Sequence, residues 1–424
     1  MKQPTFGYAA YGLLGMPLAM AALPVYVQIP AYYTTELGMA LASAGWILFL
    51  ARFIDALQDP LLGLLIDRLP GRLTLWFCAA AVLLSAAFYG LWLPPVRGEK
   101  LVAWLAVMLI LAYMAHSMLN IAYLAWGARL NPVQDGQTDT TLLGAAAWRE
   151  GAGLLGVIVA SVVPGYIFLS NRQTVQLSWY SIGFAALTML SVLALFKGAP
   201  RWQRGAAQAG VTLAGQWKIL AGNTGFRALL VPYFINAVSV SVPATLVVFF
   251  VNDRLQAAQY VPAFLATYFI AAAIGLPYWV YAAKKWGVVV SWRLGMMLAI
   301  AAFVSAGLLS AGQTMPFFVI CAASGFALGA DLALPPVLLA QVIQPGAAPA
   351  AYYGIWTLLG KFALALSGLA LPLLAYLNYH PGHPAGVELA WVYAGIPCAL
   401  KCIALALLLR ALPMQHIHHQ TRTL

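Results

Sequence analysis

The sequence has few charged residues for its length. Asp, Glu, Lys and Arg make up 8% of its 424 residues, and only 11 of these are acidic, whereas 63% of the chain is hydrophobic. A chain with so little polar surface cannot form a water-soluble globule. The composition therefore predicts an all-α protein that crosses a membrane many times.

Cysteine is also scarce. The four cysteines, Cys78, Cys321, Cys398 and Cys402, lie inside apolar runs and lack the spacing typical of metal ligands. They are predicted to be small packing residues, and neither a disulfide framework nor a zinc site is indicated. We expect no bound cofactor.

Long apolar runs, in contrast, fill most of the chain. A helix needs about 20 residues to cross about 30 Å of hydrocarbon. Twelve suitable runs lie at 9–30, 41–66, 73–94, 101–126, 141–169, 177–197, 227–250, 260–281, 291–311, 315–343, 352–378 and 388–412. Only Lys2 precedes the first run and no small-residue cleavage pattern follows it, which predicts a retained helix rather than a signal peptide. We therefore predict twelve transmembrane helices.

The net charge of +11 is distributed unevenly between the two sides of these runs. If the N-terminus is cytoplasmic, the inner loops and tails contain Lys2, Arg68, Arg72, Arg129, Lys197, Arg201, Arg204, Lys218, Arg227, Lys284, Lys285, Arg293, Arg410 and Arg422. The outer loops then contain only Arg97, Lys100, Arg172 and Arg254. This positive-inside bias predicts cytoplasmic N- and C-termini in the cell (inner or plasma) membrane. The basic residues indicate topology and contacts with anionic lipids, and no nucleic-acid partner.

One segment interrupts the regular spacing of the runs. Residues 198–226 are basic and rich in glycine and alanine, as in a linker. We predict an N-terminal six-helix bundle at 1–197, a cytoplasmic linker at 198–226, and a C-terminal six-helix bundle with a short cytoplasmic tail at 227–424. Pro60 and Pro277 each precede a basic hairpin, which indicates two pseudo-symmetric bundles with a site near the membrane midplane between them. We expect the protein to be a monomer.

Two acidic residues lie inside the second apolar run. Asp55 and Asp59 are four residues apart, and therefore on one helix face. A carboxylate near the bilayer centre costs roughly 2.5 to 3.5 kcal/mol, so two of them require a cation, a proton or a basic partner. The spacing predicts a cation site. The structural alternative is an ion pair with Arg52, although one arginine compensates only one of the two acids.

The residues around this pair resemble a known family. The segment that begins at Arg52 reads RFIDALQDPLLGLLIDR. It is similar to helix two and the next loop of the glycoside, pentoside and hexuronide cation symporters, the melibiose-permease-like branch of the major facilitator superfamily, which also includes the animal sodium-dependent lysolipid transporters. Further similarities lie at Trp148-Arg149, Asn223-x-x-Phe226-Arg227, Tyr353-Gly354 and Lys361. The resemblance implies a symporter of two six-helix bundles that works by alternating access.

The resemblance also implies a site for the coupling cation. It places the cation ligands at Asp55, Asp59, Ser117 and Asn120. Oxygen ligands of this kind suit sodium. Protons compete for the same carboxylates, because two neighbouring acids do not both ionise easily. The coupling ion is therefore expected to be sodium or a proton.

A cytoplasmic gating latch is implied by the end of the same segment. In the superfamily's general loop motif, a glycine permits close helix contact, and acidic and basic residues hold the cytoplasmic side closed. The matching residues here are Gly63, Asp67, Arg68 and Arg72.

Two basic residues match family positions on the central substrate pathway. Arg149 and Lys361 lie in apolar runs, where a cation requires an anion. We expect them to pair with Asp55 or Asp59 at rest and to hold a substrate phosphate or carboxylate once a cation or proton binds. The expected cavity-lining aromatic residues are Tyr26, Tyr353 and Trp356. The predicted substrate is an anionic or zwitterionic amphiphile, such as a lysophospholipid or a fatty-acid-like molecule.

A sugar or glycoside is the alternative substrate. Sugar-transporting relatives place acidic residues in helices one and four, where this chain has Ala19 and Asn120. The first run offers few polar groups, namely Tyr11, Tyr26 and Gln28, and a sugar site needs several that converge. Sugar recognition of the family type is therefore disfavoured.

Three further polar residues have open roles. Glu150 adjoins Arg149 but points about 100° away around a helix, so we expect it to pair elsewhere or to face water. Asp331 precedes two prolines, where a broken helix can admit a cation, but an interhelical or capping hydrogen bond is favoured. His116 either relays protons or, as we favour, packs through a hydrogen bond.

Two rival functions also use polar groups within membranes. An intramembrane prenyltransferase carries Asp-x-x-x-Asp but needs a second acidic cluster for magnesium and diphosphate. Here Asp331 stands alone, and Asp135 and Asp139 lie in a loop. A passive channel needs rings or filters of repeated polar groups, whereas this chain has one asymmetric site. We therefore predict a transporter and not an enzyme.

Overall fold

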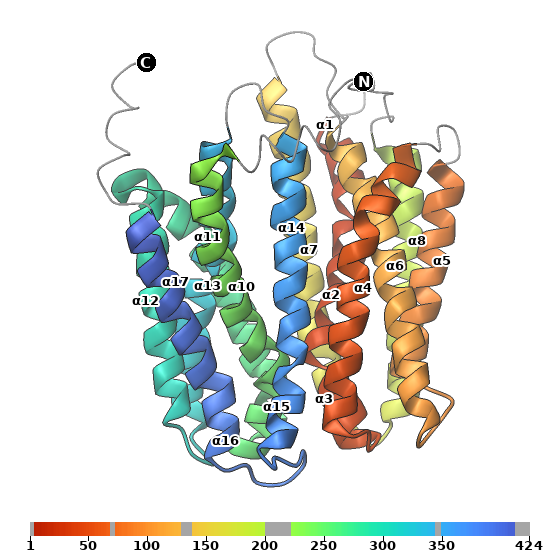
Figure 1. Cartoon of the computed structure of the whole chain (residues 1–424). Helices are drawn as coiled ribbons and strands as arrows, with labels where there is room; N and C mark the ends of the chain where they lie inside the picture. The colour runs from red at the N-terminus through yellow and green to blue at the C-terminus, as the bar shows by residue number, and fades with distance from the viewer. Residues whose placement is uncertain (1–3, 68–72, 129–137, 200–221, 344–348, 412–424) are drawn as a thin grey trace. The chain divides into compact units, whose positions relative to one another are not determined.

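The computed structural model describes residues 4–67, 73–128, 138–199, 222–343 and 349–411, apart from some side chains within these ranges. The chain divides into two compact units, Met1–Gln208 and Ala209–Leu424. Within the described residues, twelve helical segments are long and apolar enough to cross a membrane, and Figure 1 shows these long helices. The predicted all-α fold with twelve transmembrane helices is confirmed.

The first unit contains six of these segments. The first segment joins α1 (Pro4–Gly12) to α2 (Gly15–Val27), and it is followed by α3 (Ile29–Ala31) and a π-helical turn, η1 (Tyr32–Glu36). The other five are α4 (Leu41–Asp67), α5 (Leu73–Trp92), α6 (Lys100–Ala128), α7 (Thr138–Phe168) and α8 (Gln173–Gly198).

The second unit contains the other six. The first of them is α10 (Thr224–Phe249), which continues into the π-helical turn η2 (Phe250–Arg254). The second is α11 (Val261–Trp286), which follows the short 3-10 helix η3 (Ala258–Tyr260). Two unbroken helices follow, α12 (Val288–Gly307) and α13 (Thr314–Val342). The last two segments are α14 (Pro349–Gly368) with α15 (Ala370–Tyr376), and α16 (Val387–Ala390) with η4 (Trp391–Gly395) and α17 (Ile396–Ala411).

Local sequence determines where several helices begin and end. Asn223 caps α10, because its side-chain oxygen accepts a hydrogen bond of 2.9 Å from the backbone N–H of Phe226. Its Nδ2 donates to the carbonyl oxygen of Val342 at 2.8 Å, which ties the start of α10 to the end of α13. Gly287 ends α11 with a φ of +88°, a backbone conformation that favours glycine.

Glycine also allows close helix contact in each unit. A β-carbon at Gly156 of α7 would lie 2.3 Å from the carbonyl oxygen of Met16 in α2. A β-carbon at Gly325 of α13 would lie 2.1 Å from the carbonyl oxygen of Tyr268 in α11. No other residue fits at these distances, and small residues are typical where membrane helices approach closely. These contacts hold α7 against α2 and α13 against α11.

Candidate functional site

Asp55 lies on α4 and is only 1% exposed. Ser117 Oγ, on α6, donates a hydrogen bond of 2.9 Å to Asp55 Oδ1, and Gln58 Nε2 donates one of 3.1 Å to the same oxygen. Arg52 Nη1 donates to the other oxygen, Oδ2, at 3.1 Å. The structure therefore places Ser117 beside the first of the two predicted acids.

Arg52 is itself buried beside this carboxylate. The residue is 8% exposed, and its guanidinium carbon lies 4.2 Å from the centroid of the Tyr113 ring on α6, a cation–π contact. The ion pair that the sequence offered as a structural alternative is thus present. Arg52, Tyr113 and His116 also line a small cavity of about 10 Å³. That volume is enough for about one water molecule.

Asp59 lies one turn beyond Asp55 on the same helix and is partly buried. When both acids are ionised, the charges of Arg52, Asp55 and Asp59 sum to minus one. Carboxylate oxygens, the Ser117 hydroxyl and the Gln58 amide oxygen are ligand types that hard cations prefer. One sodium ion, or one proton on either carboxylate, would bring this stretch of α4 to neutrality.

Asn120 and Tyr26 are partly buried in the same unit, on α6 and α2. Asn120 is three residues beyond Ser117, so the two side chains lie on neighbouring parts of one helix face. His116 Nε2 donates a hydrogen bond of 3.2 Å to the carbonyl oxygen of Leu18. That bond joins α6 to α2, which is the packing role that the sequence analysis favoured for His116.

Arg149 on α7 bonds its neighbour Glu150. Its Nη2 and Nε lie 2.6 and 3.1 Å from Glu150 Oε1. Glu150 was expected to pair elsewhere or to face water, and its side chain is indeed exposed. Its bond with Arg149 was not expected; the long arginine side chain reaches around the helix to make it. The predicted pairing of Arg149 and Lys361 with Asp55 or Asp59 stays a prediction; the ion pair described for Asp55 is with Arg52. The side chains of Arg149 and Glu150 are 30% and 73% exposed, a setting in which an ion pair contributes about 1 kcal/mol or less.

The remaining predicted substrate residues lie on α14 in the second unit. Lys361 is partly buried and Tyr353 is 41% exposed. Trp356 is 8% exposed and stacks on Tyr233 of α10, with the ring centroids 3.4 Å apart. Trp356 is therefore part of the packed interior of this unit, whereas Tyr353 is exposed on its surface.

The predicted gating latch falls largely outside the described residues. Arg68 and Arg72 belong to the undescribed stretch 68–72. Gly63 and Asp67 lie in the last turns of α4, where the Asp67 side chain is also outside the described part of the chain.

Asp331 on α13 makes the interhelical contact that was favoured for it. Its carboxylate oxygen Oδ2 lies 2.9 Å from Nζ of Lys401 on α17. The sequence analysis missed Lys401, although a signal was available. A lysine in the middle of an apolar run is rare and requires a partner.

Comparison with known proteins identifies the family. The chain matches the family model described as MFS/sugar transport protein over residues 8–415. It is 20% identical over 431 residues to the sodium-dependent lysophosphatidylcholine symporter 1-A of Danio rerio, an alignment that covers 89% of this chain and 77% of the relative. The resemblance inferred from the sequence is thereby confirmed.

Solved structures of transporters share the fold. The nucleoside transporter NupG matches with a TM-score of 0.70 at 14% identity, over 96% of this chain and 99% of that protein. A bacterial homolog of the human lysosomal transporter Spinster, in an inward-facing and unoccupied conformation, matches with a TM-score of 0.69 at 13% identity, over 97% and 96% of the two chains. The chain belongs to the MFS/sugar transport protein family of the major facilitator superfamily, and it is a membrane transporter rather than an enzyme.

Proposed function

We propose that the protein is a secondary active symporter that moves an anionic or zwitterionic amphiphile together with sodium or a proton, by alternating access. A lysophospholipid or a fatty-acid-like molecule fits this description. The coupling cation binds at Asp55 and Asp59, with Ser117 and Asn120 as neutral ligands. The chain works as a monomer in the cell membrane, with both termini in the cytoplasm.

The surroundings of Asp55 are the observation that carries this proposal. Its carboxylate is 1% exposed and accepts hydrogen bonds from Ser117, Gln58 and Arg52. An acid buried in a membrane helix is costly and is by default a candidate for an ion or proton path. The proposed ligands, which are two carboxylates, a hydroxyl and an amide, are of types that suit a small hard cation.

Binding of the cation would change the charge balance of α4. A sodium ion or proton at Asp55 weakens the attraction of the carboxylate for Arg52, which lies 3.1 Å away. Arg149 and Lys361 are the basic residues that we propose for holding the substrate phosphate or carboxylate.

Two observations favour an amphiphile as the substrate. The relative from Danio rerio is a lysophosphatidylcholine symporter that depends on sodium. In addition, the first unit has an apolar groove lined by residues such as Leu13, Met16, Trp148 and Leu155, next to Arg149 in the sequence. An apolar groove of this kind suits the acyl chain of an amphiphile. The description of the family, MFS/sugar transport protein, makes a glycoside the second candidate.

Uptake into proteoliposomes tests the proposal. Purified protein is reconstituted, and accumulation of a radiolabelled lysophospholipid is measured under an inward sodium gradient, an inward proton gradient, or no gradient. Albumin outside removes lipid that has not been transported. A radiolabelled glycoside is tested in parallel. We expect one of the two gradients to drive accumulation of the lysophospholipid.

The matched variants are Asp55→Asn and Glu36→Gln. Both replace one acid by its amide, but Asp55 is buried and Glu36 is exposed. Asp55→Asn should abolish gradient-driven accumulation, whereas Glu36→Gln should retain it. Equal accumulation by the two variants would refute the coupling role of Asp55, and accumulation of the glycoside alone would refute the choice of substrate.

A further inference from the structure

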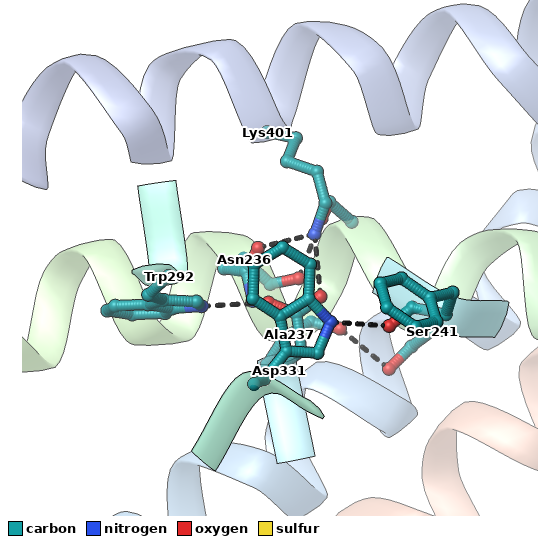
Figure 2. Close-up of polar contacts among 9 residues, drawn as sticks. Asn236, Ala237, Ser241, Trp292, Asp331 and Lys401 are labelled. Carbon is teal, nitrogen blue, oxygen red and sulfur yellow. Dashed lines mark hydrogen bonds and ion pairs between the residues drawn. The ribbon is translucent and has the colours of Figure 1, made fainter. Parts of the chain in front are cut away.

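A second buried ion pair lies in the other unit, and the proposed function does not use it. Lys401 Nζ on α17 lies 2.9 Å from Asp331 Oδ2 on α13 and 2.7 Å from Asn236 Oδ1 on α10. Asn236 Nδ2 and Trp292 Nε1 donate hydrogen bonds of 2.9 and 2.8 Å to Asp331 Oδ1. Figure 2 shows Lys401 reaching from its helix towards Asn236 and Asp331. With Trp292 on α12, the network joins four helices.

Both charges lie deep within apolar segments. The side chains of Lys401 and Asp331 are 4% and 7% exposed, within the candidate spans Val387–Arg410 and Thr314–Val342. The carboxylate and the ammonium neutralise each other, and each makes further hydrogen bonds. Removal of the ammonium alone would leave a buried carboxylate without its counter-charge, which is the most destabilising way to break such a pair.

The atoms around the ammonium are those that surround a bound cation. The lysine ammonium is a compact point charge with three donors and no acceptor, and here it is held by a carboxylate oxygen and an amide oxygen. Asp331 and Lys401, together with Ser239 and Ser324, also line a small cavity of about 10 Å³. Carboxylate, amide and hydroxyl oxygens, with room for about one water, form a ligand set for a small hard cation.

We propose that this network is a cation-binding site whose cation is supplied by the chain itself. The ammonium of Lys401 occupies the position of a free alkali cation, so the second unit stays neutral without an ion from solution. Dependence on a dissolved cation is thereby confined to the first unit. The inference goes beyond the proposed function, because it holds whether or not Asp55 binds the coupling ion.

The test replaces the tethered cation by a dissolved one. Lys401→Ala removes the ammonium and leaves room for an ion with its water. It is made in an Asp55→Asn background, so that the predicted site in the first unit makes no contribution. The melting temperature in detergent is measured in lithium, sodium, potassium or choline chloride at equal ionic strength. The control adds Asp331→Asn, which removes the carboxylate as well.

We expect Lys401→Ala to melt well below its background in choline and to be stabilised by one of the alkali cations. At a concentration about 100 times the dissociation constant, the rise should be about 5 to 10 °C. The background and the Lys401→Ala/Asp331→Asn control should not respond. Binding of radioactive sodium, if sodium is the stabilising ion, should show one site in Lys401→Ala and none in the control.

A Lys401→Ala protein that melts at the same temperature in all four salts would overturn the proposal. So would an equal response of the control. If neither variant can be recovered folded in any of the cations, packing of the lysine rather than its charge holds the unit, and the proposal is also wrong. None of these results depends on the uptake experiment, so failure here and failure of the proposed function are distinguishable.

Discussion

Replacement of Arg52 by methionine tests whether Asp55 is a ligand of the coupling cation or only the partner of Arg52 in a structural ion pair. Methionine keeps much of the apolar stem of arginine but removes its charge. Asp55 is 1% exposed, so bulk water does not solvate the carboxylate that loses its guanidinium partner. Loss of one partner from a buried ion pair typically costs 3 to 5 kcal/mol. Because Ser117 and Gln58 still donate to the carboxylate, we expect a loss near the lower limit, about 3 kcal/mol.

A dissolved cation should restore most of this loss if Asp55 belongs to a cation site. A ligand that binds only the folded state at 100 times its dissociation constant contributes about 2.7 kcal/mol. Sodium at that level, or acidification that protonates Asp55, should therefore return Arg52→Met close to the stability of the unmodified protein. The measurement is the free energy of unfolding in mixed micelles, in sodium and in choline, at neutral and at acidic pH.

The control for this prediction is Arg52→Met/Asp55→Asn, which has neither charge. It should lose less stability than Arg52→Met alone and should respond to neither sodium nor acid. If Arg52→Met is equally unstable in sodium, in choline and at acidic pH, the Arg52–Asp55 pair is structural and the cation site is refuted.

Three further predictions test other parts of the structure. Asp59→Asn should abolish gradient-driven uptake while its melting temperature stays close to that of the unmodified protein; retained accumulation would refute its coupling role. Lys361→Ala should weaken substrate binding in a titration more than cation binding, and equal losses would contradict the assignment. Gly156→Ala should destabilise the protein by about 1 to 3 kcal/mol, because its β-carbon would lie 2.3 Å from the carbonyl oxygen of Met16. Gly151→Ala, on the same helix with no atom within 4 Å of its β-carbon, is the control and should not reduce the melting temperature.

Much of the fold follows from the sequence because the membrane imposes a simple rule. Every span needs about 20 apolar residues, and the runs that meet this requirement correspond to the twelve helical segments of the structure. The break in the first segment was not predicted. The chain leaves the regular helix at Leu13 and Leu14, between α1 and α2, although both residues are good helix formers. Close contacts such as the one at Gly156 depend on the partner helix, which the local sequence does not specify.

The candidate site was predictable where it depends on neighbours along one helix. The Arg52–Asp55 pair follows from a spacing of three residues, whereas Ser117 was placed beside Asp55 only through the family resemblance. Pairings between distant helices, or through long side chains, were missed. Lys401 was overlooked as the partner of Asp331, which lies on another helix. The bond between Arg149 and Glu150 was also missed, because helix geometry fixes the direction of each Cβ but not how far an arginine side chain reaches.

Charge movement after a cation jump tests the central claim most directly. Proteoliposomes are adsorbed on a solid-supported membrane, and the current is recorded when sodium is added, or when the pH is lowered, without substrate. The account predicts a transient current in the unmodified protein for one of the two jumps, and no such current in Asp55→Asn/Asp59→Asn. An identical current in that double variant would show that the cation binds elsewhere.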